Sequence, residues 1–218
     1  MIDLHTHSLL SDGELIPSEL IRRFEVMGYS AVGVTDHADS SNLDFIITNI
    51  VKMAEELNGS QTVKVIPGIE LTFVPPDLIA DYIRTARGLG AKLVLVHGES
   101  IVEPVPAGTN MAAIKAGADI LAHPGLISKE EVKLAAEREV FLELTSRQGH
   151  SLSNGHVARL AIDSGAKLVL NSDTHYIGDQ MTENFANRIV EGAGLPSGSL
   201  KTLLSNSVQL LERIGYPL

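Results

Sequence analysis

Short, strongly apolar segments alternate along the chain with longer segments whose apolar residues recur at helical spacing. Short apolar runs are typical of strands and a 3.6-residue period is typical of helices, so the pattern predicts the two in alternation. We expect seven strands, at residues 2–7, 29–37, 64–71, 92–97, 118–123, 140–144 and 167–175. We expect helices at residues 17–27, 43–57, 76–87, 128–138 and 154–163, a short one capped by Thr109, and two or three more around residues 182–191, 199–204 and 207–214.

The predicted strands are apolar on both faces, which is typical of a parallel sheet covered by helices. An open doubly wound sheet and a closed barrel both fit this alternation. No break in composition, low-complexity run or charged linker divides the 218 residues. We therefore expect one domain spanning residues 1–218.

Nearly every predicted strand ends in a side chain that can bind a metal ion. These side chains are His5, His7, His37, Glu70, His97, His123, Asp173 and His175, so six of the eight histidines lie at strand ends. Right-handed crossovers place the carboxyl ends of parallel strands on one face, and in a barrel those ends surround a single mouth. The outer strands of an open sheet would lie too far apart to share one site. The pattern therefore favours a barrel with a metal site built from imidazole and carboxylate ligands.

Composition removes several other classes of protein. The chain has no cysteine, which excludes disulfides, thiolate metal sites and a cysteine nucleophile. Neither a signal segment nor a membrane-spanning apolar run is visible, so we expect a cytoplasmic protein that makes no membrane contact. The formal net charge is −10 and no basic run is present. This charge makes binding of extended nucleic acid unlikely and favours a small substrate.

Taken in order, the strand-end motifs resemble those of the PHP (polymerase and histidinol phosphatase) phosphoesterases. The motifs are His5-Thr6-His7-Ser8, Asp12-Gly13, Thr35-Asp36-His37, Gly68-Ile69-Glu70, His97-Gly98, Ala122-His123-Pro124-Gly125 and Asn171-Ser172-Asp173-Thr174-His175. They span residues 2 to about 176, and residues 97–154 look most like the stand-alone, histidinol-phosphatase-like branch. The resemblance implies an α/β fold of the PHP type, a distorted seven-stranded (βα)7 TIM-like barrel.

The resemblance also implies two to three divalent metals, and zinc, manganese and iron all suit such ligands. The resemblance implies by position that one ion would bind His5, His7, Glu70 and Asp173. A second ion would bind Glu70, His97 and His123, and a third would bind Asp12, His37 and His175. Many relatives have histidine where this chain has Asp12, which puts the strength of the third site in doubt. Asp3 and Asp36 are candidates to orient the histidine ligands.

The activity implied by the resemblance is hydrolysis of a small phosphomonoester, and histidinol phosphate is the substrate for which the family is named. A hydroxide held on the metals bridged by Glu70 would attack phosphorus, and Asp173 or His175 would assist the proton transfer. Arg147 is the candidate phosphate binder, because its guanidinium fork suits phosphate oxygens. The candidates to face the leaving group are Glu99, Glu103 and His150.

Three alternatives stay open at the level of sequence. The first is a phosphoesterase acting on nucleotides or nucleic-acid ends, and the second is an amidohydrolase-like metal hydrolase. Seven strands, and Glu70 as the bridge in place of a carboxylated lysine, argue against the second. The third is a non-catalytic subunit of a larger complex, as in ribonuclease P protein subunits with a related barrel; filled ligand positions argue against it. The oligomeric state is not determined by the sequence.

Overall fold

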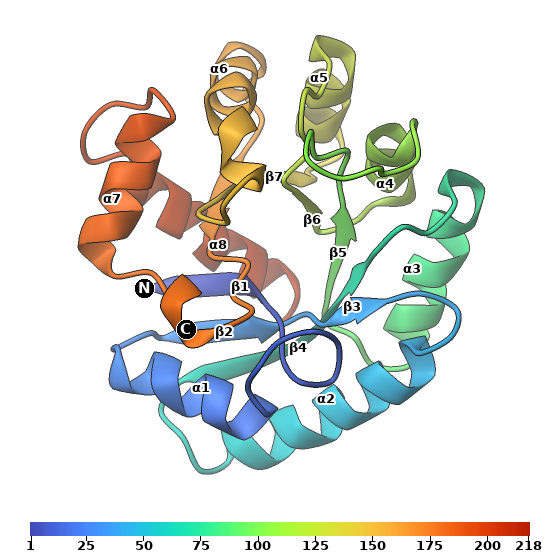
Figure 1. Ribbon diagram of the computed structural model, residues 1–218, viewed down its shortest axis with the longest axis vertical. Helices are drawn as coiled ribbons and strands as arrows, with labels where there is room; N and C mark the ends of the chain where they lie inside the picture. Colours follow the sequence, from blue (N-terminus) through green and yellow to red (C-terminus); the bar gives the residue numbers. More distant parts are fainter.

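The computed structural model describes residues 1–218 and contains a ring of parallel strands surrounded by helices (Figure 1). The strands are β1 (Ile2–Thr6), β2 (Ala31–Val34), β3 (His37–Ala38), β4 (Lys64–Leu71), β5 (Leu93–His97), β6 (Ile120–Ala122), β7 (Phe141–Thr145) and β8 (Leu168–Asn171). Seven of them follow the order β1-β2-β4-β5-β6-β7-β8, every pair is parallel, and β3 pairs with β4. The predicted strand at residues 29–37 is thus two short strands, both of which pair with β4.

The helices lie between the strands in sequence and outside them in space. They are α1 (Pro17–Val26), α2 (Leu43–Asn58), α3 (Ile79–Gly88), α4 (Thr109–Ala116), α5 (Lys129–Glu137), α6 (Asn154–Ser164), α7 (Glu183–Gly192) and α8 (Leu200–Arg213), with 3₁₀ turns η1 (Pro76–Leu78), η2 (His150–Ser153) and η3 (Ile177–Asp179). The predicted capping box of Ser128 with Glu131 is present at the start of α5. Residues 199–204 and 207–214 form one helix, α8, instead of two.

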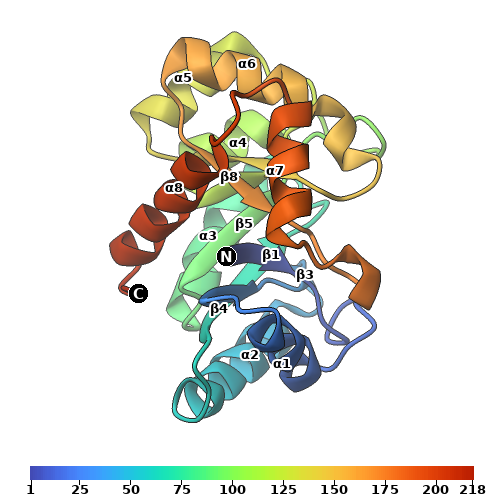
Figure 2. The same ribbon diagram turned by 90° about the vertical axis from the view of Figure 1, so that its left-hand side faces the viewer.

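The two ends of the sheet meet where β1 lies beside β8, and side chains supply part of the pairing there. The Leu4 amide donates to Asn171 Oδ1 at 2.8 Å, and the Ser172 amide donates to the Asp3 carboxylate at 3.2 Å. Closer to the strand ends the pairing is backbone to backbone, with the His7 amide donating to the Thr174 carbonyl at 2.8 Å. Figure 2 faces this seam and shows α8 beside it. These contacts nearly close the barrel, which confirms the (βα)7 expectation.

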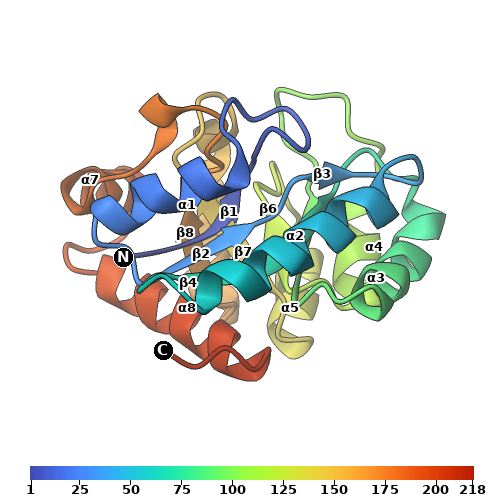
Figure 3. The same ribbon diagram turned by 90° about the horizontal axis from the view of Figure 1, so that it is seen from below.

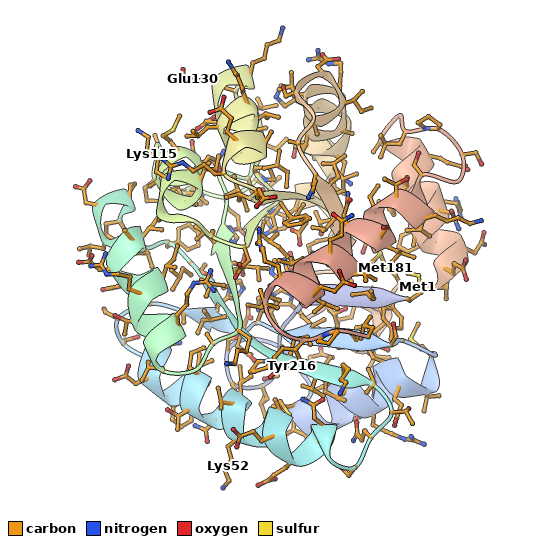
Figure 4. The ribbon with its side chains drawn as sticks, turned by 180° about the vertical axis from the view of Figure 1, so that it is seen from behind. Met1, Lys52, Lys115, Glu130, Met181 and Tyr216 are labelled. Carbon is orange, nitrogen blue, oxygen red and sulfur yellow. The ribbon has the colours of Figure 1, made fainter.

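The apolar residues fall into two layers separated by the strands. A cluster of 47 buried residues fills the space between the strands and the outer helices. A second cluster of 12 buried residues includes Leu93 and Leu95 from β5 and also Leu210 and Leu211 from α8. α8 therefore closes one end of the barrel, and in Figure 4, which views the molecule from behind, it crosses in front of the strands with Tyr216 just beyond its end.

The loops that follow the strands gather at the opposite end of the barrel from α8. Figure 3 shows these loops along the upper side of the molecule and α8 along the lower side. This arrangement makes one end an apolar base and the other an open mouth lined by strand ends. None of the helices combines the length and the hydropathy that a membrane-spanning segment requires.

Candidate metal centre

The inward face of each strand changes from apolar to polar as the strand approaches the mouth. On β5, Leu93 and Leu95 belong to the apolar interior cluster, and His97 is the next residue on that face. On β4, Ile66 belongs to the same cluster and Glu70 lies four residues further on. Because side chains alternate across a strand, a single register delivers both the apolar base and the polar mouth.

β1 also delivers a polar side chain to the mouth, but it does so through an irregularity in its register against β2. The register of β1 against β2 shifts between Asp3 and Thr6, so that Leu4 lies in the apolar interior while His5 still reaches Glu70. Gly33 lies opposite this shift, where a Cβ atom would come within 2.8 Å of the Leu4 carbonyl oxygen. The absence of a side chain at this position therefore lets the irregular segment of β1 approach β2.

The structure brings all nine predicted ligands together at the mouth. Glu70 is fully buried at the centre: His5 Nε2 lies 3.3 Å from its Oε2, and His97 Nδ1 lies 3.3 Å from its Oε1. His123 Nε2 lies 3.5 Å from Glu70 Oε1. The remaining ligand candidates, all within the overlapping groups of metal-ligating atoms, are His7, Asp12, His37, Asp173 and His175.

Many buried polar atoms in this cluster have no hydrogen-bond partner. They include both ring nitrogens of His7, both carboxylate oxygens of Glu70 and Oδ1 of Asp173. An unsatisfied buried polar group costs about 1–3 kcal/mol, so several in contact require a compensating partner. Imidazole nitrogens and carboxylate oxygens are suitable ligands for zinc, manganese and iron. The cluster therefore fits bound divalent metal.

The division of the ligands into separate sites is less clear in the structure than the family resemblance implies. His7 groups with Asp12, His37 and His175 as well as with His5 and Glu70. His37 Nδ1 also lies 2.7 Å from Glu70 Oε2, between two of the expected sites. The allocation of ligands to individual ions therefore stays a prediction.

Burial and the charges of neighbouring residues set the protonation states of Glu70 and His7. Burial disfavours ionisation of Glu70, but the neighbouring His5, His37 and His97 outweigh it and hold the pKa of this carboxyl well below its usual value. Burial, together with the adjacent His37 and His5, lowers the pKa of His7 well below the usual value. Glu70 is therefore an anion and His7 a neutral imidazole, the forms in which each binds a metal.

Glu143 is a component of the site that sequence reasoning missed. It lies on β7, fully buried, and its Oε1 accepts hydrogen bonds from His5 Nδ1 and Asn171 Nδ2, both at 2.8 Å. Its Oε2 accepts the backbone amide of His123 at 3.0 Å. The hydrogen bond to Glu143 Oε1 makes Nδ1 of His5 the donor, which leaves Nε2 of the same ring free to bind a metal. The sequence does contain a signal for this position: the two-residue period of β7 points the side chain of residue 143 into the barrel.

The prediction that Asp3 and Asp36 orient histidine rings was wrong. Asp3 accepts the backbone amides of His5 and Ser172, and it strengthens the seam between β1 and β8. Asp36 accepts hydrogen bonds from the backbone amides and hydroxyls of Ser8 and Ser11, which shapes the loop after β1. Both aspartates therefore support the backbone that carries ligands.

A cleft of about 450 Å³ lies over the cluster, and three of the four predicted substrate residues, Arg147, His150 and Glu103, line it. Arg147 donates a hydrogen bond from Nη1 to Asp179 Oδ2 at 2.8 Å. His150 lines it, with its ring stacked on His123 at 4.2 Å. Glu99 lies elsewhere: its carboxylate accepts the amides of Gly108 and Asn110 at 3.0 Å, at the start of α4.

Glu99 therefore takes the capping role that we expected of Thr109. Thr109 is the first residue of α4 and its hydroxyl donates to the Pro106 carbonyl, so it offers nothing to the free amides of the first turn. Glu103, another of the predicted substrate residues, lines the cleft with its carboxylate 2.7 Å from His97 Nε2. Ser11, Asn42, Thr72 and Phe73 also line it. Phe73 was not anticipated from sequence.

Comparison with known proteins decides the family. The sequence model of the PHP domain matches residues 3–159. The chain belongs to the PHP domain family. This membership confirms the expected resemblance and the expected class of enzyme, a metal-dependent phosphoesterase.

Two relatives align over nearly the whole chain. An uncharacterised protein of Methanocaldococcus jannaschii is 46% identical over 215 residues, covering 97% of this chain and 99% of its own. A probable phosphatase of Shewanella halifaxensis is 29% identical over 236 residues, covering 97% of this chain and 90% of its own.

Solved structures share the fold at low sequence identity. Histidinol phosphate phosphatase from Lactococcus lactis, complexed with zinc, L-histidinol and phosphate, superposes with a TM-score of 0.58 at 16% identity, covering 89% of this PHP chain and 94% of its own. Ochratoxinase from A. niger gives a TM-score of 0.62 at 14% identity, covering 96% of this chain and 70% of its own. The fold is therefore shared with a histidinol phosphate phosphatase and with an ochratoxinase, and fold similarity alone does not select a reaction.

Proposed function

We propose that this PHP-domain protein hydrolyses a small phosphomonoester, such as a histidinol-phosphate-like metabolite. The observation that carries the proposal is the position of Arg147, which lines the same cleft as the candidate metal ligands. A guanidinium beside a cluster of divalent-metal ligands is an arrangement suited to a phosphate dianion. The histidinol and phosphate bound to the Lactococcus lactis structure support the same class of substrate.

Two to three divalent ions, of zinc, manganese or iron, are proposed to occupy the cluster. When bound, such ions supply a nucleophilic water and neutralise charge on the phosphoryl oxygens. Glu70 offers two unpaired oxygens, each close to different histidines, and can therefore bridge two ions. Asp173 and His175 lie beside one another, with His175 Nδ1 3.4 Å from Asp173 Oδ1, and are the candidates to accept or return a proton.

The charge of the cleft favours a monoester that has no second phosphate. Arg147 is the only lysine or arginine among the residues that line it, and Asp12 and Glu103 add negative charge. A nucleoside bisphosphate would place its second phosphate where no further guanidinium or ammonium group is available. The same cleft lacks the basic groove that tracks a nucleic-acid backbone.

The test is phosphate release from four compounds: an aryl phosphate, histidinol phosphate, a nucleoside bisphosphate and a short RNA. We expect release from the small monoesters that is abolished by a chelator and by His97→Ala. His156→Ala is the matched control, because His156 lies on α6 and bonds the Ile127 carbonyl outside the cluster. Release of phosphate from the bisphosphate or the RNA alone would contradict the proposal.

A further inference from the structure

Phe73 stands apart from the polar side chains around it. It follows β4 three residues after Glu70, and it is the one hydrophobic residue among the twelve that line the cleft. Its side chain is 46% exposed, whereas its neighbour Val74 is 3% exposed and belongs to the core. The chain therefore buries one apolar residue and directs the preceding one into the mouth.

The backbone is strained to achieve this. Phe73 has a φ of +53°, a left-handed conformation that bulky residues rarely adopt. Of the other three non-glycine residues with positive φ, His123 and Asp173 are candidate ligands, and Glu139 lies in the turn before β7. Strained residues cluster at functional sites when the surrounding structure holds them in place.

Neighbouring contacts hold Phe73 on both sides. The Thr72 amide donates to the Ala38 carbonyl at 3.1 Å, which extends the pairing of β3 with β4, and Val74 is anchored in the core. One face of the Phe73 ring stacks on His97, with ring centroids 5.5 Å apart and an angle of 29° between the planes. With one face on a candidate ligand and nearly half of the side chain exposed, the ring offers a free aromatic surface beside the metal centre.

The ring and the guanidinium lie at opposite ends of a row of histidines. His37 lies in the middle, with its ring 6.0 Å from that of His97 and 5.5 Å from that of His175. At the His97 end is Phe73. At the His175 end, Asp179 accepts hydrogen bonds from the His175 amide and from Arg147 Nη1. A phosphate held toward Arg147 therefore leaves the other end of the cleft for the alcohol.

We propose that Phe73 is a stacking platform for a planar aromatic ring in the leaving group. The substrate class is then narrower than small phosphomonoesters in general: it is phosphate esters of alcohols that carry an aromatic or heteroaromatic ring. This inference rests on the proposed phosphatase function and deepens it. Aromatic pairs contribute beyond the area they bury, and the expected preference for a ring over an equally large saturated group is roughly 3- to 10-fold.

The experiment compares benzyl phosphate with cyclohexylmethyl phosphate. Both are esters of primary alcohols of similar size, and they differ in whether the ring is planar and aromatic. For the metal-loaded wild-type protein we expect a kcat/KM ratio of roughly 3 to 10 in favour of benzyl phosphate. Phe73→Leu should bring the ratio close to one, and Phe73→Tyr should retain it. Phe185→Leu is the matched control, since Phe185 is 41% exposed on α7 and does not line the cleft.

A binding measurement provides a second readout that does not depend on turnover. Calorimetry with benzylphosphonate and cyclohexylmethylphosphonate should show the same ratio of affinities and the same loss in Phe73→Leu. Equal hydrolysis and equal binding of the two rings by wild type would overturn the inference while leaving the phosphatase function intact. Release of phosphate from neither ester, nor from any monoester, would overturn the proposed function and the inference with it.

Discussion

The buried carboxylate of Glu143 gives the sharpest test of how the barrel positions its ligands. It accepts three hydrogen bonds, from His5 Nδ1, Asn171 Nδ2 and the His123 amide. Glu143→Gln preserves shape and removes the charge. Every one of the three partners is a donor in the wild-type protein, so the NH₂ group of a glutamine faces a donor in either orientation.

Both orientations of that glutamine impair the site. With NH₂ toward His123, a buried backbone amide loses its acceptor. With NH₂ toward His5, Nδ1 must become the acceptor, which moves the ring proton to the nitrogen that faces Glu70. Loss of a hydrogen bond to a charged group costs about 1.5–3 kcal/mol, and changes of this kind behind a ligand lower metal affinity about 10- to 100-fold.

The assay is competition for metal with a chromophoric chelator, combined with urea unfolding of the metal-free protein. We expect Glu143→Gln to bind its tightest metal about 10- to 100-fold more weakly than wild type. Glu130→Gln is the matched control, because Glu130 is exposed on α5 and points away from the molecule (Figure 4). A folded Glu143→Gln protein with wild-type metal affinity would refute the reasoning.

Three further changes have definite expectations. Asp179→Asn should raise the dissociation constant for inorganic phosphate roughly 10-fold by releasing Arg147, measured by calorimetry; weakened metal binding with unchanged phosphate affinity would contradict this. Leu211→Ala, at the fully buried base of the barrel, should lower the free energy of unfolding by about 2–5 kcal/mol in urea titrations; a loss below 1 kcal/mol would show that α8 does not seal the barrel. Glu25 has its pKa lowered to about 2, first by the Thr62 amide and then by Arg22 and the Thr62 hydroxyl. The contribution of ionised Glu25 to the stability of the folded protein is complete above its usual pKa of 4.5 and is lost as the pH falls toward 2. Glu25→Gln should therefore make the urea midpoint fall less steeply with pH between 4.5 and 2; identical pH profiles of variant and wild type would exclude this contribution.

The barrel and its ligand cluster could be predicted because both depend on local pattern. Apolar runs predict strands, and right-handed crossovers fix the face on which every strand ends. His97, which ends β5, and His123, which follows β6, could therefore be expected to meet without knowledge of any loop. Lys64–Leu71 was predicted as a strand with the bounds that β4 has.

The residues that depend on distant contacts could not be predicted in this way. Glu143 lies within an apolar strand, and only the closed barrel shows that His5 lies across from it. Glu99 has the same chemistry as a substrate-facing carboxylate, but the path of the loop turns it onto the amides before α4. The direction of Phe73 follows from a positive φ imposed by neighbouring contacts, which its sequence context does not reveal.

The most direct test of the central claim is a metal titration of the apoprotein. Zinc, manganese or iron is added in steps to chelator-treated protein, and bound metal and phosphate release from histidinol phosphate and benzyl phosphate are measured at each step. We expect no release from the apoprotein, and release that rises with occupancy to two to three ions per chain. Full metal loading without phosphate release from any monoester, or release that persists in the apoprotein, would contradict the account.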